Sequence, residues 1–436
     1  MFKTNRSARR PGANVALAIA LMAGSALGTV ALEAPAYAQK KKAKEAKPDY
    51  SAAFIEAARP VEAALGAATP DAATAATLLP ALRSSVSTAD DKYAAGGMVY
   101  NIGRLTDDSA MQREGVAMML ESGRTPAENV SKFNMLAGQL AYNAQDWAAA
   151  QTYLLRAEEA GADIGDTTGL LTETYFAQNQ NQQGLTLLRE RIAARQAAGL
   201  EIDQNWVRRG LSVAYEGNMP DEAVRYSVLY VTLFPSPDAW GDAIAIQRNM
   251  LDYQPQETLD LLRLARAAKV LRNERDYLDY VDAADFRRLP SEVVAVLDEG
   301  IADGSLQANN PYVTEVRGNA NGRIAADKAE LSKLEADARA AGAGSTIVIA
   351  TGDAFLNYDQ PAKAEEFYTM ALDKPGADTP RVLTRLGIAQ MRQGKAAEAQ
   401  ATFAKVDGAR QAIARLWGAY AAGSASAPAT TVQPGG

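Results

Sequence analysis

Small and aromatic residues recur in this 436-residue chain at a period of about 34 residues. Each clear unit has a small residue, a second small residue twelve positions later, and an aromatic residue four positions after that. The two clearest units contain Gly352, Ala364 and Tyr368, followed by Gly387, Ala399 and Phe403. Self-similarity at such a period is typical of repeat architectures. It restricts the fold to supersecondary units that stack in a row.

The same spacing fits earlier parts of the chain. Matching positions are Gly138, Ala150, Leu154 and Ala157, then Thr172, Gly184 and Leu188, then Leu211, Ala223 and Ser227. A small residue at a helix crossing lets two helices approach, and the larger residue one turn further on fills the gap. The pattern therefore predicts helical hairpins, each with an apolar face that only the next hairpin buries.

Composition favours the same fold class, because hydrophobic residues make up 47% of the chain but aromatic residues only 7%. Alanine is prominent, and it is the best helix former. The pattern resembles the tetratricopeptide repeat family, and the residues that carry the resemblance are Gly352, Phe355, Ala364, Tyr368 and Ala371, with Leu386, Gly387, Ala399 and Phe403. The resemblance covers roughly residues 130–235 and 345–420. It implies an all-α, right-handed superhelical solenoid of antiparallel helix hairpins.

Seven segments follow from these patterns. We predict a signal peptide over 1–38, a basic disordered linker over 39–49, N-terminal helical capping repeats over 50–128, tetratricopeptide-like repeats over 129–236, degenerate helical repeats over 237–344, C-terminal tetratricopeptide-like repeats and a capping helix over 345–422, and a disordered tail over 423–436. Whether residues 237–344 continue the superhelix or break it stays open.

The first 38 residues have the three parts of an export signal. A basic start with Arg9 and Arg10 precedes an apolar stretch from Ala13 to Leu32, and Ala36 and Ala38 form a cleavage site of small residues. Cleavage would leave Gln39 first and release the protein into the periplasm. The alternative is an inner-membrane anchor formed by an uncleaved N-terminal helix.

The chain contains no Cys and no His, which excludes thiol nucleophiles, Ser-His-Asp triads and zinc sites built on these residues. We therefore predict no metal, no cofactor and no catalytic residue. The formal charge is −7; the first 38 residues carry 4 − 1 = +3, so the remainder carries −10. An acidic body argues against nucleic acid as a partner. Membrane contact is expected only through the basic linker.

The main alternative is a helical-superhelix enzyme that acts on cell-wall sugars through Asp and Glu alone, with its site in the less regular residues 240–344. Two properly placed carboxylates suffice for glycoside hydrolysis. The favoured interpretation is a non-catalytic scaffold, because no catalytic motif is found.

In the family that this chain resembles, the first helix of each repeat lines a concave groove that holds an extended peptide. Carrying these positions over gives Met135, Gln139, Tyr142 and Asn143, then Glu173 and Phe176, then Asn205, Arg208, Ser212 and Tyr215, and finally Arg381, Thr384, Ile388, Met391 and Arg392. Such side chains suit a peptide backbone. Ordinary surface polarity explains them equally well. The expected partner is a protein or peptide of the cell envelope.

Overall fold

The computed structural model describes residues 48–426, except for the side chains of residues 164–166 and 426. The predicted signal peptide, nearly all of the basic linker and residues 427–436 of the predicted tail lie outside this range. Over the described residues the chain forms twenty α-helices and one short 3-10 turn, without a strand. The predicted all-α array of helix hairpins is confirmed.

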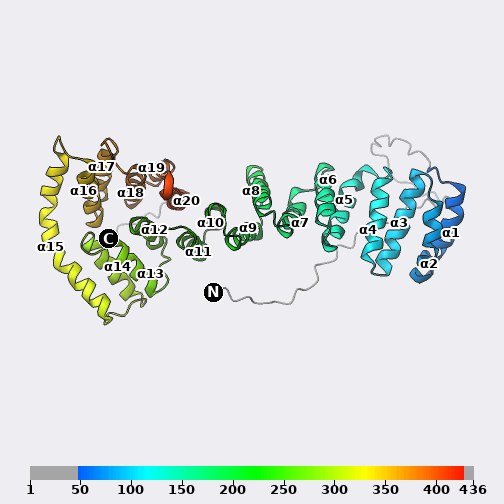
Figure 1. Cartoon of the computed structure of the whole chain (residues 1–436), viewed down its shortest axis with the longest axis horizontal. Helices are drawn as coiled ribbons and strands as arrows, with labels where there is room; N and C mark the ends of the chain where they lie inside the picture. Colours follow the sequence, from blue (N-terminus) through cyan, green and yellow to red (C-terminus); the bar gives the residue numbers. More distant parts are fainter. Residues whose placement is uncertain (1–47, 427–436) are drawn as a thin grey trace, which may run out of the picture. The chain divides into compact units, whose positions relative to one another are not determined.

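The chain divides into two compact units that meet within one helix, between Thr174 and Tyr175 (Figure 1). The first unit contains α1 (Ala52–Leu65), α2 (Ala72–Ser85), α3 (Ala89–Leu105), α4 (Ser109–Glu121), α5 (Ala127–Asn143), α6 (Trp147–Glu159) and most of α7 (Ile164–Ala177).

The second unit begins with α8 (Asn181–Ala197), α9 (Gln204–Glu216), α10 (Pro220–Leu233), α11 (Pro237–Met250), α12 (Pro255–Ala267), α13 (Glu274–Ala284) and α14 (Pro290–Ala302). It continues with α15 (Pro311–Arg339), α16 (Ser345–Asn357), α17 (Pro361–Leu372), α18 (Thr379–Arg392), α19 (Ala396–Phe403), the 3-10 turn η1 (Gly408–Arg410) and α20 (Gln411–Ser426). The disordered tail predicted from residue 423 therefore begins too early, since its first four residues belong to α20.

Local sequence signals set where these short helices start. Proline occupies the first turn of seven of them, where its missing N–H costs nothing; these are α10, α11, α12, α14, α15, α17 and α18. In other helices an N-cap side chain accepts a hydrogen bond from an N–H of the first turn, as Asp146 does from Ala149. Frequent caps divide a helix-rich sequence into short antiparallel pairs.

The glycines of the repeat lie where the two helices of a hairpin cross. A Cβ added to Gly352 would lie 2.7 Å from Tyr368 Cε1, and one added to Gly387 would lie 2.5 Å from Phe403 Cε1. The aromatic rings therefore occupy the space that a side chain at the glycine would need. This confirms the predicted role of the small and aromatic positions.

The predicted register of the third unit is wrong by one residue. Its close approach is made by Gly210, where a Cβ would lie 2.1 Å from Tyr226 Cε1. Twelve residues after Gly210 the chain has the buried Glu222, which binds Arg189 and accepts a 3.1 Å hydrogen bond from Gln182. A paired carboxylate stands where three other units have alanine (Ala150, Ala364 and Ala399), and the apolar pattern therefore pointed to the neighbouring position.

The long helix α15 interrupts the stacking of hairpins. Its first half lies along α14, where Arg317 forms a 2.7 Å ion pair with Asp298. Its second half lies along α16 (Figure 1), and at its end Arg339 pairs with Glu366 of α17 at 2.6 Å. The start of α14 meets the end of α16, since Glu292 N–H donates to Asn357 Oδ1 at 2.9 Å. The degenerate region therefore ends in a break, not in a further repeat.

A simple length comparison explains this arrangement. At 1.5 Å per residue, the 29 residues of α15 span about 43 Å, while α14 and α16, with 13 residues each, together span about 39 Å. The helix α15 thus runs beside both of them, from the end of α14 to the start of α16. Between its two contact regions most of residues 321–330 are exposed.

The last helix packs back onto α10, α11 and α12 of the second unit. The helix α20 contacts α10 and α12. Gln247 of α11 donates a 2.9 Å hydrogen bond to the carbonyl of Ala412, and Tyr420 donates at 2.8 Å to the carbonyl of Ala267. The edge-to-face pair of Trp240 and Tyr420 lies in the same contact. Within the second unit, the array therefore closes on itself.

Candidate functional site

The α5 positions predicted to contact a peptide lie on one face of that helix, in the first unit. Gln139 and Asn143 are exposed, and Met135 and Tyr142 are half-buried. The Tyr142 ring packs edge-on against Trp147, with centroids 5.3 Å apart. Phe133, Ala137, Leu140 and Ala141 are buried on the opposite side. The four predicted residues therefore form a mixed polar and aromatic surface.

The two predicted residues on α7 differ from each other in exposure. Glu173 is half-buried, whereas the side chain of Phe176 is only 8% exposed. Its ring lies 2.5 Å from the position that a Cβ on Gly184 would take, and the Arg209 guanidinium covers it at 5.4 Å. Phe176 therefore packs inside the second unit and does not face a partner.

The four predicted residues on α9, in the second unit, lie at positions i, i+3, i+7 and i+10, so they share one helix face. Asn205, Arg208 and Tyr215 are exposed and Ser212 is half-buried. No hydrogen bond or ion pair within residues 48–426 engages the Arg208 guanidinium, and the Tyr215 side chain is 39% exposed. The opposite face buries Val207, Gly210, Val213 and Ala214. The α9 face is therefore open.

The α18 positions have a different environment. Thr384 is fully buried and its hydroxyl donates to the Pro380 carbonyl, while Ile388 is 1% exposed in the core. Met391 packs against the same core. Thr384 and Ile388 cannot line an open groove because their side chains are buried, whereas Met391 is half-buried. For Thr384 and Ile388 the prediction is wrong.

The remaining two α18 positions bind other helices of the same unit. Arg381 Nη2 donates to Asp353 Oδ2 at 2.7 Å, and Arg392 donates to the Leu356 carbonyl at 2.9 Å. Arg392 also lies 3.8 Å from Glu292. Both side chains are partly exposed, so they mark the edge of a set of charged residues inside the unit.

Three buried carboxylates form the centre of that set, which we call the ionic cluster: Asp260, Glu292 and Asp353 with Arg263, Arg381, Arg385, Arg392 and Arg410. Asp260 of α12 is fully buried. It accepts from Arg263 at 3.0 Å and from Arg385 at 3.3 Å, and it also binds Arg410 of η1. One carboxylate therefore joins α12, α18 and η1.

Glu292 of α14 is held by a two-point contact from Arg263, at 2.8 and 2.6 Å, and by the hydroxyl of Tyr280 at 2.6 Å. Burial alone would raise the pKa of Glu292, but the Arg263 guanidinium outweighs it and holds this pKa well below its usual range. Arg263 bridges Glu292 to Asp260, which links α14 to α12.

Asp353 of α16 accepts hydrogen bonds from Arg385 at 2.6 and 2.7 Å, from Arg381, and from the Tyr368 hydroxyl at 2.7 Å. Burial opposes its ionisation, yet Arg385 and Arg381 lower the pKa of Asp353. Asp353 therefore links α16 to Tyr368 of α17 and to two arginines of α18.

This chemistry differs from what the alternative enzyme would need. A glycosidase general acid requires a carboxyl group with a raised pKa. In the ionic cluster, arginine lowers the pKa of both Glu292 and Asp353. Over residues 48–426, no group of three or more Asp or Glu side chains is placed to hold a metal ion. The cluster is therefore arranged to connect helices.

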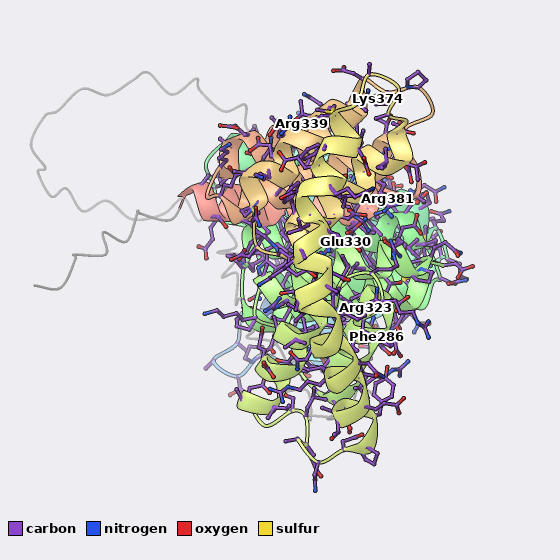
Figure 2. The ribbon with its side chains drawn as sticks, turned by 90° about the vertical axis from the view of Figure 1, so that its left-hand side faces the viewer. Phe286, Arg323, Glu330, Arg339, Lys374 and Arg381 are labelled. Carbon is purple, nitrogen blue, oxygen red and sulfur yellow. The ribbon has the colours of Figure 1, made fainter. Side chains whose placement is uncertain are left out.

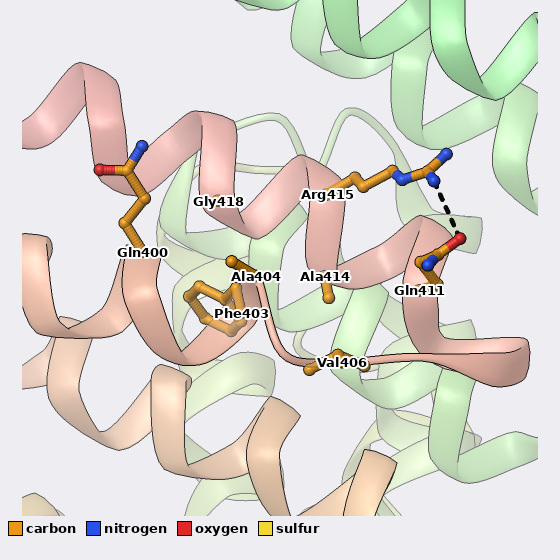
Figure 3. Close-up of a pocket in the computed structure, with 8 residues that line it drawn as sticks. All are labelled: Gln400, Phe403, Ala404, Val406, Gln411, Ala414, Arg415 and Gly418. Atoms are coloured by element: carbon orange, nitrogen blue, oxygen red, sulfur yellow. Dashed lines mark hydrogen bonds between the residues drawn. The ribbon is translucent and has the colours of Figure 1, made fainter.

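A surface pocket of about 380 Å³ lies between α19 and α20 (Figure 3). Its lining residues are Gln400, Phe403, Ala404, Val406, Gln411, Ala414, Arg415 and Gly418. Phe403, Val406 and Ala414 are buried, while Arg415 donates a 2.9 Å hydrogen bond to Gln411 at the rim. The pocket marks the end of the array, where no further hairpin follows within the described residues.

No family model matches the sequence, and no curated protein matches it. Among solved structures, the chain is similar to the TPR2AB domain of yeast Sti1 in its complex with pHSP90, with 12% identity, 69% of this chain and 95% of that chain covered, and a TM-score of 0.25. It is similar to the Naa15/Naa10 complex bound to HypK, with 13% identity, 80% and 62% covered, and a TM-score of 0.30.

The TPR domain of P58(IPK) is a third such structure, with 11% identity, 85% and 98% covered, and a TM-score of 0.23. These scores are too low to transfer any property of those proteins. The close contacts between glycines and aromatic rings in the hairpins are observed in this chain itself and do not depend on the comparisons. The hairpins are tetratricopeptide-like.

The sequence reasoning did not find the ionic cluster: it named Arg381 and Arg392, but as contacts for a peptide. The other members of the cluster appeared as ordinary charges among alanines and leucines. A usable signal was present in α12, where Asp260 and Arg263 lie between Leu259, Leu261, Leu262 and Leu264. Charges within such an apolar run have no solvent face to occupy, and they therefore indicate a buried ion pair.

One further observation concerns membranes. Over residues 48–426, every helix is too short or too polar to cross a lipid bilayer. The apolar stretch of the predicted signal peptide lies outside these residues.

Proposed function

We propose that this protein is a periplasmic, non-catalytic scaffold that binds an extended segment of a cell-envelope protein. The open face of α9, with Asn205, Arg208, Ser212 and Tyr215, is the observation that carries the proposal. A second contact surface is the α5 face. Each belongs to the first helix of a hairpin, the position at which tetratricopeptide-like repeats present side chains outward from the hairpin core.

The chemistry of the α9 face supports a peptide ligand. Tyrosine offers a large contact area at low conformational-entropy cost, and arginine and asparagine offer donors to backbone carbonyls. The guanidinium of Arg208 has no partner within the described residues, so a ligand need not displace an internal bond. The buried α18 positions are not part of this surface.

The periplasmic setting rests on the sequence of residues 1–38. A basic start, an apolar stretch and the small residues Ala36 and Ala38 support export with cleavage. Absence of His and Cys supports a non-catalytic role, because the commonest general bases and nucleophiles are missing.

Site-specific photo-crosslinking in living cells tests the proposal. A photoreactive amino acid replaces Ser212 in one strain and Lys333, which is 78% exposed on α15, in a control strain. We expect a discrete crosslinked protein from position 212 and none of the same mass from position 333. The partner should then bind the purified protein, and Tyr215→Ala should weaken that binding about tenfold, as for a central aromatic contact.

A matched control is Tyr312→Ala, because Tyr312 is also 39% exposed but lies on α15. It should leave binding within about twofold of the unchanged protein, in line with a residue outside the contact surface. Equal crosslinking from positions 212 and 333, or equal loss with both tyrosine variants, would rule out the α9 face as the binding surface.

A further inference from the structure

The exposed edge of the ionic cluster holds more arginine than its carboxylates compensate. Arg288, in the turn between α13 and α14, donates a 3.0 Å hydrogen bond to Gln256 Oε1. The buried Arg385 donates to the same oxygen at 2.7 Å. Two guanidinium groups therefore converge on one neutral acceptor. No ion pair within the described residues involves Arg288, which is exposed.

Arg381 lies next to this pair and also has unused donors. Its Nη2 shares Asp353 Oδ2 with Arg385, while its Nε is buried and has no hydrogen-bond partner. Unpaired buried donors are rare in proteins and call for an explanation. Figure 2 labels Arg381 and Phe286 on the same side of α15. Arg381 is also close enough to Arg288 to contribute to the lowered pKa of Arg288.

The charge balance of the whole group leads to the same conclusion. Six arginines belong to it: Arg263, Arg288, Arg381, Arg385, Arg392 and Arg410. The carboxylates are Asp260, Glu292 and Asp353, with Asp285 close to Arg288. The balance is 6 − 4 = +2. Burial and the nearby Arg385 lower the pKa of Arg288, as expected for a cation among other cations.

We propose that Arg288 and Arg381 form a binding site for the carboxylate side chain of an acidic protein segment. Asp353 already shows how a carboxylate fits between Arg381 and Arg385. Within the described residues no hydrogen bond engages Nη1 of Arg381, whose side chain is partly exposed, and this group and the exposed guanidinium of Arg288 offer the same kind of donors outward. Guanidinium groups suit planar carboxylates because two N–H groups can engage the two oxygens. This site is separate from the α5 and α9 faces, so it goes beyond the proposed function.

Calorimetry on the full-length mature chain tests the site. The probes are a hexaglutamate peptide blocked at both ends, the matching hexaglutamine peptide and inorganic phosphate, at about 50 mM salt, where exposed charges are weakly screened. We expect hexaglutamate to bind and hexaglutamine not to bind. Arg288→Gln should weaken hexaglutamate binding about tenfold, the usual scale for losing one charge-assisted contact.

Arg287→Gln is the matched control, because Arg287 neighbours Arg288 but packs on the Phe286 ring. It should change binding less than about twofold, as expected for a surface charge outside the site. Arg381→Lys keeps the charge but removes the planar fork, and it should also weaken binding.

Three outcomes would overturn the proposal. One is that hexaglutamate does not bind. Another is equal weakening by Arg287→Gln and Arg288→Gln, which would show diffuse charge attraction. The third is binding of phosphate in preference to hexaglutamate, which would assign the site to a free anion. Circular dichroism of each variant confirms that it is folded, and none of these results depends on the partner captured at α9.

Discussion

The indole nitrogen of Trp417 on α20 donates a 2.9 Å hydrogen bond to the backbone oxygen of Asp260, although 157 residues separate them in the chain. The carboxylate of the same aspartate binds Arg263, Arg385 and Arg410. Asp260 thus uses its backbone to hold α20 and its side chain to hold α18 and η1. Asp260 therefore contributes to the closed arrangement of the second unit through both its backbone and its side chain.

Replacing Asp260 should strongly destabilise the second unit. Asp260→Ala leaves three buried or nearly buried guanidinium groups without a shared carboxylate, and removal of one member of a buried ion pair typically costs about 3–5 kcal/mol. Urea denaturation followed by tryptophan fluorescence measures the change. Asp238→Ala is the control, because the Asp238 side chain is 96% exposed, and it should change stability by less than about 0.5 kcal/mol. Similar midpoints for the two variants would contradict a central role for Asp260.

Two glycine-to-alanine changes should have opposite signs. At Gly210 the new Cβ would lie 2.1 Å from Tyr226 Cε1, and Tyr226 is fixed by its hydrogen bond to the Leu185 carbonyl. Overpacking of this kind costs about 1–3 kcal/mol. At Gly322 in α15 a Cβ meets nothing within 4 Å, so alanine should stabilise the helix by up to about 1 kcal/mol. Thermal melting of both variants measures the two changes in stability. A Gly210→Ala variant that is more stable than the unchanged protein would be incompatible with the close crossing of α9 and α10.

The first unit should lose stability through Asp91 as the pH falls from about 4 to about 2. Burial tends to raise the pKa of Asp91, but hydrogen bonds from Ser51, Ser87 and Thr88 outweigh it and lower the pKa to about 2. The contribution is therefore fully present above the unfolded-state pKa of about 4 and is lost as the pH falls to about 2. The shift corresponds to about 2 kcal/mol.

A comparison with the Asp91→Asn variant isolates the contribution of the Asp91 charge to the stability of the first unit. The unchanged protein should be more stable than the variant at pH 7, and the difference should shrink between about pH 4 and pH 2, where the aspartate becomes protonated. Denaturation curves at several pH values provide the measurement. A difference that stays constant down to pH 2 would show that Asp91 contributes through packing and not through its charge.

Export can be checked by sequencing the N-terminus of the protein from an envelope fraction. We expect the mature chain to begin at Gln39, because a signal peptidase accepts the small residues Ala36 and Ala38. Replacing Ala38 with a bulky residue should leave the precursor uncut. A mature chain that begins at Met1 in the membrane fraction would support the uncleaved anchor instead.

The repeat units were predictable because their signal is local. Gly352 and Tyr368, or Gly387 and Phe403, lie on the two helices of one hairpin, so their spacing alone places them in contact. The α9 residues came from the resemblance to tetratricopeptide repeats; Asn205, Arg208 and Tyr215 are exposed, and their contact with a partner stays a prediction. At Glu222 the pattern failed, because the charge that replaces alanine is neutralised by Arg189 from another helix.

The closure of the second unit was not predictable in this way. Asp260 meets Trp417 and Arg410 across more than a hundred residues, and no spacing rule connects positions so far apart. Assigning Thr384 and Ile388 to a groove assumed that α18 faces outward as in an open array. In this chain α18 also contacts η1 and α20, and the side chains of Thr384 and Ile388 are buried, so that assumption does not hold.

The length of α15 also fixes the direction in which the following helices leave it. A helix turns about 100° and rises about 1.5 Å with each residue, so a single insertion in its uncovered middle would swing everything after it through more than a quarter turn. Two whole turns would restore the direction but push Asn357 about 10 Å away from Glu292. Evolution of this sequence should therefore place insertions and deletions in the inter-helix turns and keep the residue count of α15 fixed.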